Sequence, residues 1–323
     1  MNYIYTSSFA PMIMDMIQFR VSLGYSESSY TSELYDFDQF CTKHYPNANC
    51  LIEEIVMEWG SRRETEGLNG FKHRLIAVRQ FSKYLNFREL DPYIIPIDLI
   101  GKYEPFYPYI FTDNELTIFF RTIDTIAPSK RSPFKEYTLP VLFRLAYGCG
   151  LRPNEVRDLR KYDVDYKSGT IFIYNLKTKK DRIISITPDL AELCRKYDAL
   201  SEYSYPNRQW FLQFPIKNSY RRRWISNQLR KYWKESGQLG NPIRYPRVYD
   251  FRNYATRILM KWFDAGTDIM VMLPYLSTYM GHVEFQSTAY YIHLLPERLT
   301  KNKNFDWYKF ESLIPEVKYE EEK

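Results

Sequence analysis

Residues 146–156 read AYGCGLRPNEV, and their pattern predicts the end of one helix, a turn and the start of another. Its two glycines end one helical pattern, and Pro153 suits the first position of the next helix. Arg152 therefore falls in a turn beside a helix N-terminus, where a guanidinium and free backbone N–H groups together suit a phosphate oxygen. Glu155 can accept a hydrogen bond from Arg152 and hold it in place. On these residues alone, an ordinary surface ion pair fits equally well.

The first quarter of the chain is predicted to be helical. Apolar side chains recur at three- to four-residue spacing in four runs between residues 11 and 86, and turn-forming residues separate the runs. Four short helices are the simplest interpretation. The apolar positions are Met14-Ile17-Val21, Tyr30-Leu34-Phe37-Phe40, Ile52-Ile55-Trp59 and Phe71-Leu75-Val78-Phe81-Leu85.

The fourth of these runs also carries basic side chains, which would give a small helical domain one basic face. Such a face could bind DNA, although a solvated helix surface fits the charges equally well. The candidate DNA-binding residues here are Lys72, Arg74, Arg79 and Lys83.

A change in pattern marks the border of a second domain. Residues 91–110 are rich in proline, which disfavours helix and sheet pairing, so this segment is predicted to be a linker. Thr112 and Glu115 then have the spacing of a capping box, which predicts a helix start. Residues 135–147 should form a buried helix, in which Pro140 marks the start or a kink.

Two segments of the second domain look like strands. Residues 169–174 and 182–186 are rich in branched side chains and flank a polar, lysine-loaded turn, so they predict a hairpin. Helical patterns resume at Pro188. The expected fold class is therefore mainly α with a small β-sheet (α+β).

Composition narrows the classes of function. A formal charge of +6, a pI near 8.8 and 30 tyrosines fit a polyanionic partner but do not require one. No apolar stretch approaches the roughly 18 residues of a membrane span, and the N-terminus lacks a secretory pattern, so a cytoplasmic protein without a membrane partner is expected. The four cysteines lack zinc-type spacing and are expected to be reduced thiols.

Residues 150–156 resemble the first signature box of the tyrosine recombinase (phage integrase) family, whose arginine contacts the scissile phosphate. The other boxes follow in the family's order. Lys177, in the hairpin turn, occupies the position of the family's catalytic lysine, with Lys179 and Lys180 as the alternatives. Residues 249–256 look like the H-x-L-R-H-x-x-A-T segment, so Arg252 matches the second arginine.

Two further positions complete the resemblance. Tyr249 stands where the family usually has histidine. Residues 280–282 resemble the L-G-H box, and the family's nucleophilic tyrosine lies nine residues after its histidine. That count, starting from His282, selects Tyr291 over Tyr290. The boxes cover residues 108 to 296, whereas the N-terminal helical region resembles the family's core-binding domain only in size, helix pattern and position.

The resemblance implies a site-specific recombinase similar to transposon and phage integrases and to Xer-type recombinases. Tyr291 would attack phosphorus to form a 3′-phosphotyrosine intermediate. Arg152 and Arg252 would neutralise charge on the phosphate, Lys177 would protonate the leaving 5′-oxygen, and His282 would bond the phosphate or help to deprotonate the tyrosine. No cofactor and no metal are implied.

The resemblance also implies the organisation and the partners. Residues 1–90 would form a helical core-type DNA-binding domain, 91–110 a linker and 111–296 the catalytic domain. The tail, 297–323, carries the stripe Trp307-Phe310-Ile314 and could pack on a neighbouring protomer or, equally well, within its own chain. Double-stranded DNA recombination sites, a homotetramer on DNA and accessory DNA-bending proteins are the implied partners.

A second basic cluster lies further along the chain, at Arg221, Arg222 and Arg223 beside Trp224, and could grip the DNA backbone. A solvated helix face is the alternative. Two alternative functions are a type IB topoisomerase, which shares this chemistry, and a DNA-binding regulator that kept the fold and lost catalysis. A metal-dependent nuclease would need a carboxylate cluster that the sequence does not contain.

Overall fold

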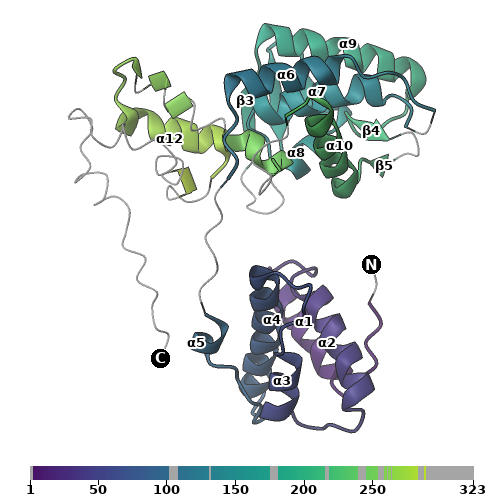
Figure 1. Cartoon of the computed structure of the whole chain (residues 1–323), viewed down its shortest axis with the longest axis vertical. Helices are drawn as coiled ribbons and strands as arrows, with labels where there is room; N and C mark the ends of the chain where they lie inside the picture. The colour runs from purple at the N-terminus through teal and green to yellow at the C-terminus, as the bar shows by residue number, and fades with distance from the viewer. Residues whose placement is uncertain are drawn as a thin grey trace. The chain divides into compact units, whose positions relative to one another are not determined.

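The computed structural model describes residues 3–101, 108–130, 132–174, 181–214, 218–238, 245–253, 258–259, 261–262, 264–282 and 287–288. The chain divides into two compact units, Met1–Phe106 and Tyr107–Lys323 (Figure 1). Each unit has a hydrophobic core of its own.

The first unit contains the four predicted helices and one further turn of helix. Aromatic rings make up much of its core, where Phe37 lies edge-on to Trp59 and Phe9 edge-on to Phe81 at 6.3 Å between ring centroids. The longest helix, α4, packs against α1, α2 and α5. The elements are α1 (Ala10–Ser22), α2 (Thr31–His44), α3 (Glu53–Trp59), α4 (Leu68–Phe87) and α5 (Ile97–Ile100).

The buried face of α1 differs from the expected one. Met14 and Val21 are exposed, whereas Ile13 and Met16 are buried. This helix has apolar residues on most of its circumference, so the sequence pattern does not choose a face, and packing against α2 and α4 decides it.

The expectation of an exposed basic face on α4 is wrong for Lys72 and Arg74, because both side chains are buried. The Arg74 guanidinium donates to both carboxylate oxygens of Glu66 at 2.9 and 2.8 Å and lies over the Trp59 ring. A buried guanidinium needs such partners to offset the loss of water. Arg74 therefore ties α4 to the end of α3.

The segment 91–110 is not a linker along its whole length. Ile95 and Ile100 are buried in the core of the first unit, and α5 forms within this segment. Tyr109 and Phe111 pack against the core of the second unit. Although proline disfavours regular pairing, Ile95 and Ile100 bury their apolar side chains, and α5 packs against α4.

The second unit is built around α7, which packs against α6, α8, α9 and the 3-10 helix η2. Pro140 lies inside α7 and does not mark its start. The mainly helical fold with a small sheet is confirmed. Its helices are α6 (Asp113–Asp124), α7 (Lys135–Gly148), α8 (Pro153–Arg157), η1 (Lys161–Asp163), α9 (Pro188–Ser204), α10 (Arg222–Glu235), η2 (Val248–Asn253) and α12 (Ile269–Met280).

The predicted hairpin is also confirmed, with Ile171 opposite Ile184 in an antiparallel pair. The structure adds a third strand at its edge and a second, two-stranded sheet, so the expectation of a single sheet pair was incomplete. The strands are β1 (Val164–Asp165), β2 (Thr170–Ile173), β3 (Arg182–Ser185), β4 (Gln213–Phe214) and β5 (Asn218–Ser219).

The capping box at the start of α6 forms as predicted. The Thr112 hydroxyl accepts from the backbone N–H of Glu115 at 3.2 Å, and the Glu115 carboxylate accepts from the backbone N–H of Thr112 at 2.7 Å. These bonds satisfy two of the groups that a helix end leaves without partners.

We expect Thr112→Ala to lower the free energy of unfolding of the second unit by about 1 kcal/mol, because the helix loses its N-cap acceptor. Thr117→Ala is the matched control, since Thr117 is exposed inside the same helix and alanine is the better helix former there. Urea unfolding followed by tryptophan fluorescence measures both variants. Equal stability of the two would contradict a role for the cap.

Candidate active site

Two glycine turns meet at the centre of the candidate site. Gly150, between α7 and α8, has φ of 58°, and Gly281, after α12, has φ of 62°. Both lie in the left-handed region, which side chains with a Cβ rarely adopt. A Cβ on Gly281 would also lie 2.7 Å from the Arg182 guanidinium. Glycine is therefore required at 281 by its backbone conformation and by a close neighbour.

Arg252 joins the two turns. It lies in η2 and is fully buried, and its guanidinium donates to the carbonyl oxygen of Gly150 at 2.6 Å and to that of Met280. The neighbouring Phe251 anchors η2 in the core, where its ring stacks on Phe111 at 4.8 Å. Packing of the aromatic core thus places Arg252 under both turns.

Arg152 lies directly before α8, with Pro153 at the first position of the helix as predicted. Its guanidinium donates to Glu155 at 2.7 Å, which confirms the expected pairing, and also to the carbonyl oxygen of Gly281 at 2.9 Å. About 26% of its side chain remains exposed. Arg152 is thus held from two sides and still reaches solvent.

Arg182 is a site residue that the sequence analysis did not single out. From the start of β3 it donates to both carboxylate oxygens of Glu155, at 3.0 and 2.9 Å, and to the carbonyl oxygen of Tyr279. Burial opposes ionisation of Glu155, but the bonds and charge of Arg182, with help from Arg152, lower the pKa of this carboxyl. One signal was available, because strand alternation puts Arg182 on the same inward face as Ile184.

His282 follows the Gly281 turn, and its Nδ1 lies 2.7 Å from the Thr288 hydroxyl. Burial lowers the pKa of His282 to about 3, and the positive charges of Arg252, Arg152 and Arg182 act in the same direction. The imidazole is therefore neutral near pH 7, so one of its nitrogens can donate a hydrogen bond and the other can accept one.

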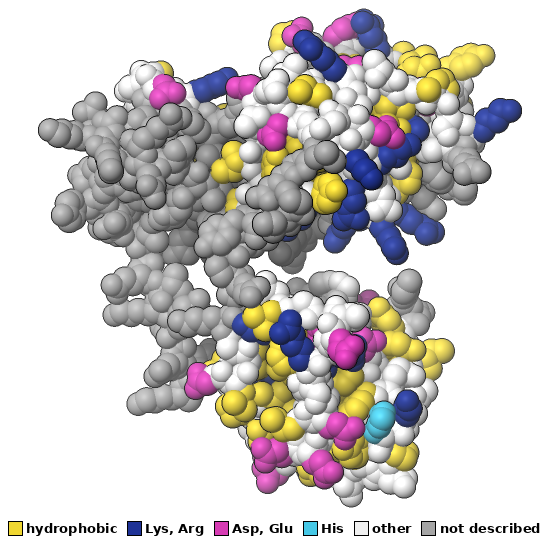
Figure 2. All heavy atoms as spheres, in the orientation of Figure 1, with side chains coloured by type: hydrophobic (Ala, Val, Ile, Leu, Met, Phe, Trp, Pro, Cys, Tyr) yellow, Lys and Arg dark blue, Asp and Glu magenta, His cyan; other side chains and the backbone are white. Residues whose placement is uncertain are grey.

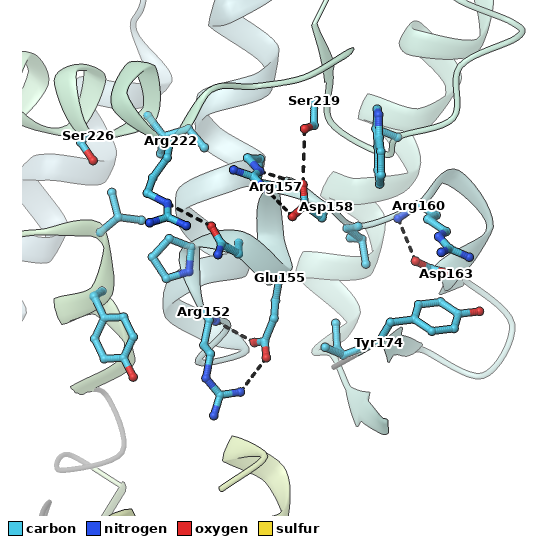
Figure 3. Close-up of a pocket in the computed structure, with 18 of the residues that line it drawn as sticks. Arg152, Glu155, Arg157, Asp158, Arg160, Asp163, Tyr174, Ser219, Arg222 and Ser226 are labelled. Atoms are coloured by element: carbon cyan, nitrogen blue, oxygen red, sulfur yellow. Dashed lines mark hydrogen bonds and ion pairs between the residues drawn. The ribbon is translucent and has the colours of Figure 1, made fainter. Parts of the chain in front are cut away.

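A cavity of about 920 Å³ opens beside Arg152. Figure 3 shows Arg152 and Arg222 at one side of it, Arg160 and Tyr174 at the other, and Glu155 between them. Tyr249 is 44% exposed and also lines this cavity. The basic residues in its wall are Arg152, Arg157, Arg160, Arg222 and Arg247. They outnumber the acidic ones, which are Glu155, Asp158 and Asp163.

The cluster Arg221 to Arg223 is exposed at the start of α10. Arg222 donates to the Asn154 side chain at 3.2 Å, and below it the Tyr220 and Trp224 rings stack at 4.4 Å. Figure 2 shows dark-blue side chains gathered around α10 on the second unit. The cluster therefore extends the basic wall of the cavity onto the surface.

The remaining predicted residues fall into two groups. On the first unit, Lys83 is exposed, whereas Arg79 is half-buried and donates to the carbonyl oxygen of Ile95 at 2.8 Å. Lys177 and Tyr291 lie outside the described residues. The structure thus brings Arg152, Arg252 and His282 together and places Tyr249 on the cavity wall.

The part of the chain that the structure describes holds no group of three or more His, Cys, Asp or Glu side chains that could bind a metal ion. Within the same residues, no helix is both long and apolar enough to cross a bilayer.

The fold is that of tyrosine recombinases. The solved structure of the XerH site-specific recombinase bound to difH substrate superposes with a TM-score of 0.65 over 91% of this chain and 84% of that one, at 20% identity. A lambda integrase dimer bound to a COC′ core site superposes with a TM-score of 0.56 over 87% of this chain and 94% of that one, at 12% identity.

The chain belongs to the phage integrase family, which its sequence matches over residues 112–298. A Sinorhizobium fredii protein named as an integrase/recombinase, y4rB, is 26% identical over 90% of this chain and 94% of its own length. Tyrosine recombinase XerC of Chlamydia caviae is 25% identical over 72% of this chain and 70% of its own length.

The buried, neutral His282 should make the stability of the protein depend on pH. Because its pKa in the folded chain, about 3, is below the value of about 6.5 expected in the unfolded chain, the unfolded state binds more protons between these values. Stability from this residue is therefore lost as the pH falls from about 6.5 towards 3.

We expect His282→Gln to lose less stability than the unmodified protein between pH 7 and pH 4, as measured by urea unfolding at each pH. His73→Gln, a change of the same kind at an exposed site on α4, controls for the loss of one histidine. Parallel stability curves for His282→Gln and the unmodified protein would contradict the buried neutral state.

Proposed function

We propose that this protein is a site-specific DNA recombinase that cleaves and rejoins strands through a covalent 3′-phosphotyrosine intermediate. The observation that carries the proposal is the meeting of Arg152, Arg252 and His282 at two glycine turns beside a basic cavity. Membership of the phage integrase family supports the same reaction. Integration, excision and resolution all use this chemistry.

The proposed reaction needs positive charge at the phosphate. As the tyrosine oxygen attacks, negative charge builds up on the non-bridging oxygens, and fixed guanidinium groups stabilise it without a metal ion. Arg152 is partly exposed on the cavity side and is suited to make the first contact. Arg252 is fully buried, so its contact with a phosphate would require the turn at 280–282 to move when DNA binds.

The remaining roles follow from the chemistry of each side chain. The Tyr291 oxygen forms a bond to phosphorus while the bond from phosphorus to the 5′-oxygen breaks, and Lys177 supplies the proton that this oxygen takes up. The neutral His282 can donate a hydrogen bond to the phosphate, whereas its lowered pKa makes it a weak acceptor for the tyrosine proton. Tyr249 replaces the family's usual histidine and can donate one hydrogen bond from the cavity wall.

Duplex DNA is the proposed substrate. The XerH and lambda integrase structures contain DNA, which supports a DNA partner for a chain of the same fold. On the second unit, the exposed guanidinium groups of Arg221, Arg222 and Arg223 would contact the phosphate backbone, and on the first unit the exposed Lys83 and the half-buried Arg79 would do so. A homotetramer on DNA, packing of the tail 297–323 on a neighbouring protomer, accessory DNA-bending proteins and a cytoplasmic location belong to the same proposal.

We expect Tyr291→Phe to abolish the covalent protein–DNA adduct and to leave DNA affinity nearly unchanged, because only the nucleophilic oxygen is lost. Trapping on a nicked substrate made from the ends of the recombination site measures the adduct, and a gel-shift assay measures affinity. Tyr290→Phe is the matched control and should form the adduct. Adduct formation should persist in EDTA.

An adduct that survives in Tyr291→Phe but not in Tyr290→Phe would move the nucleophile to the neighbouring residue. DNA binding without any adduct in the unmodified protein would point instead to a regulator that has lost catalysis. A strict requirement for Mg²⁺ in strand cleavage would contradict the mechanism.

We expect Arg152→Ala to slow single-turnover cleavage about a hundredfold, because a fixed charge at the transition state is lost. Arg157→Ala is the matched control, since Arg157 lines the same cavity but donates to Asp158, whereas Arg152 also donates to the Gly281 turn. It should cleave within a few-fold of the unmodified rate. Equal rates for the two variants would make Arg152 a structural residue.

A further inference from the structure

The Glu155 carboxylate is shared between two guanidinium groups. Its Oε1 accepts from Arg152 Nη1 at 2.7 Å and from Arg182 Nη1 at 3.0 Å. Its Oε2 accepts from the backbone N–H of Arg152 at 2.8 Å and from Arg182 Nη2 at 2.9 Å. Four bonds therefore fix the carboxylate in place, two of them from each arginine.

The ion pair at the centre of this arrangement is buried. The side chains of Arg182 and Glu155 are 5% and 7% exposed, whereas that of Arg152 is 26% exposed. A buried ion pair contributes little net stability compared with apolar side chains of the same volume, since both charges lose water. We therefore consider what the Arg182–Glu155 pair does for the third group in contact with it, which is Arg152.

Charge balance gives Arg182 a second effect. Arg152 and Glu155 by themselves form a neutral pair, which would do little to stabilise the negative charge that builds up on a phosphate in the transition state. With Arg182 behind the carboxylate, the three groups carry a net charge of +1, and the exposed member of the three is Arg152. The positive charge is therefore presented at the cavity, although Arg182 itself does not line that cavity.

The same two arginines also hold the end of α12. Arg182 Nε donates to the carbonyl oxygen of Tyr279 at 2.9 Å, and Arg152 Nη2 donates to that of Gly281 at 2.9 Å. Carbonyl groups at a helix C-terminus carry partial negative charge, so cations are favourable there. The turn that leads into His282 is thus fixed by the groups that fix Glu155.

We propose that Arg182 is a positioning residue, which holds Glu155 between two guanidinium groups so that Arg152 keeps both its orientation and its net positive charge toward the DNA phosphate. This inference rests on the proposed recombinase function. Arg182 acts through Glu155 and Arg152 and touches no substrate itself. Removing it should therefore affect the cleavage step far more than DNA binding.

The test uses the full-length protein and a nicked DNA substrate under single-turnover conditions. We expect Arg182→Met to slow cleavage about ten- to a hundredfold, as misplacement of a transition-state contact does, while DNA affinity changes by less than about threefold. Arg182→Lys keeps the charge but loses the bidentate contact with Glu155. Its cleavage rate should therefore lie between that of the unmodified protein and that of Arg182→Met.

Arg208→Met is the matched control for loss of a buried arginine. Arg208 lies in the same unit, is 4% exposed, is paired with Asp198 and Glu202, and does not line the cavity. Its loss should lower the thermal stability of the protein and leave the cleavage rate of the folded fraction unchanged. A rate that falls as much in Arg208→Met as in Arg182→Met would overturn the positioning role.

Combining substitutions separates positioning from general support of the fold. If Arg182 acts through Arg152, then adding Arg182→Met to Arg152→Ala should slow cleavage no further. Additive losses would overturn the proposal, as would an unmodified rate in either folded Arg182 variant. Arg182→Lys carries the same test if the methionine variant does not fold. If the recombinase function itself is wrong, the unmodified protein will form no covalent adduct with DNA, and this result differs from each outcome above.

Discussion

The buried carboxylate of Glu155 is the interaction on which the rest of the second unit depends. A carboxylate out of contact with water is costly unless charged donors surround it, and Arg152 and Arg182 supply them from α8 and β3. Because the same arginines donate to carbonyl oxygens at the end of α12, this one group brings three distant segments to a common point. The arrangement of this site therefore follows from the hydrogen bonds that the buried Glu155 carboxylate requires.

The aromatic core places the second half of that site. Phe251 stacks on Phe111 and lies beside Phe119 and Phe143, so η2 cannot shift without opening the core. Arg252, the next residue, is directed under the Gly150 and Met280 carbonyl oxygens by this packing. The Arg252 guanidinium is therefore fixed in position by the core on one side and by the two carbonyl oxygens on the other.

Basic residues in this chain serve two different purposes. Arg74 and Arg208 are buried and hold elements together through carboxylates, whereas Arg221 to Arg223 are exposed at the start of α10. Arginine therefore stabilises the fold where it is buried, and it is accessible to a polyanion where it is exposed. Net charge alone therefore says little about which surface of the protein would bind DNA.

The sequence by itself determined the features that depend on residues close together in the chain. The Thr112 capping box, the turn that sets Arg152 before Pro153, the Arg152–Glu155 pair and the hairpin of β2 and β3 all involve near neighbours or a plain alternation of side chains. The family resemblance added the positions of Arg252 and His282, because the signature boxes keep their order along the chain.

Only the tertiary structure decided the features that depend on partners far away in the chain. Arg182 meets Glu155 across 27 positions and Tyr279 across 97, and no local pattern reveals such contacts. The same holds for the buried face of α1 and for the burial of Lys72 and Arg74, which the sequence placed on a basic surface. Whether a charge faces water is settled by what packs over it, and that is a property of the assembled fold.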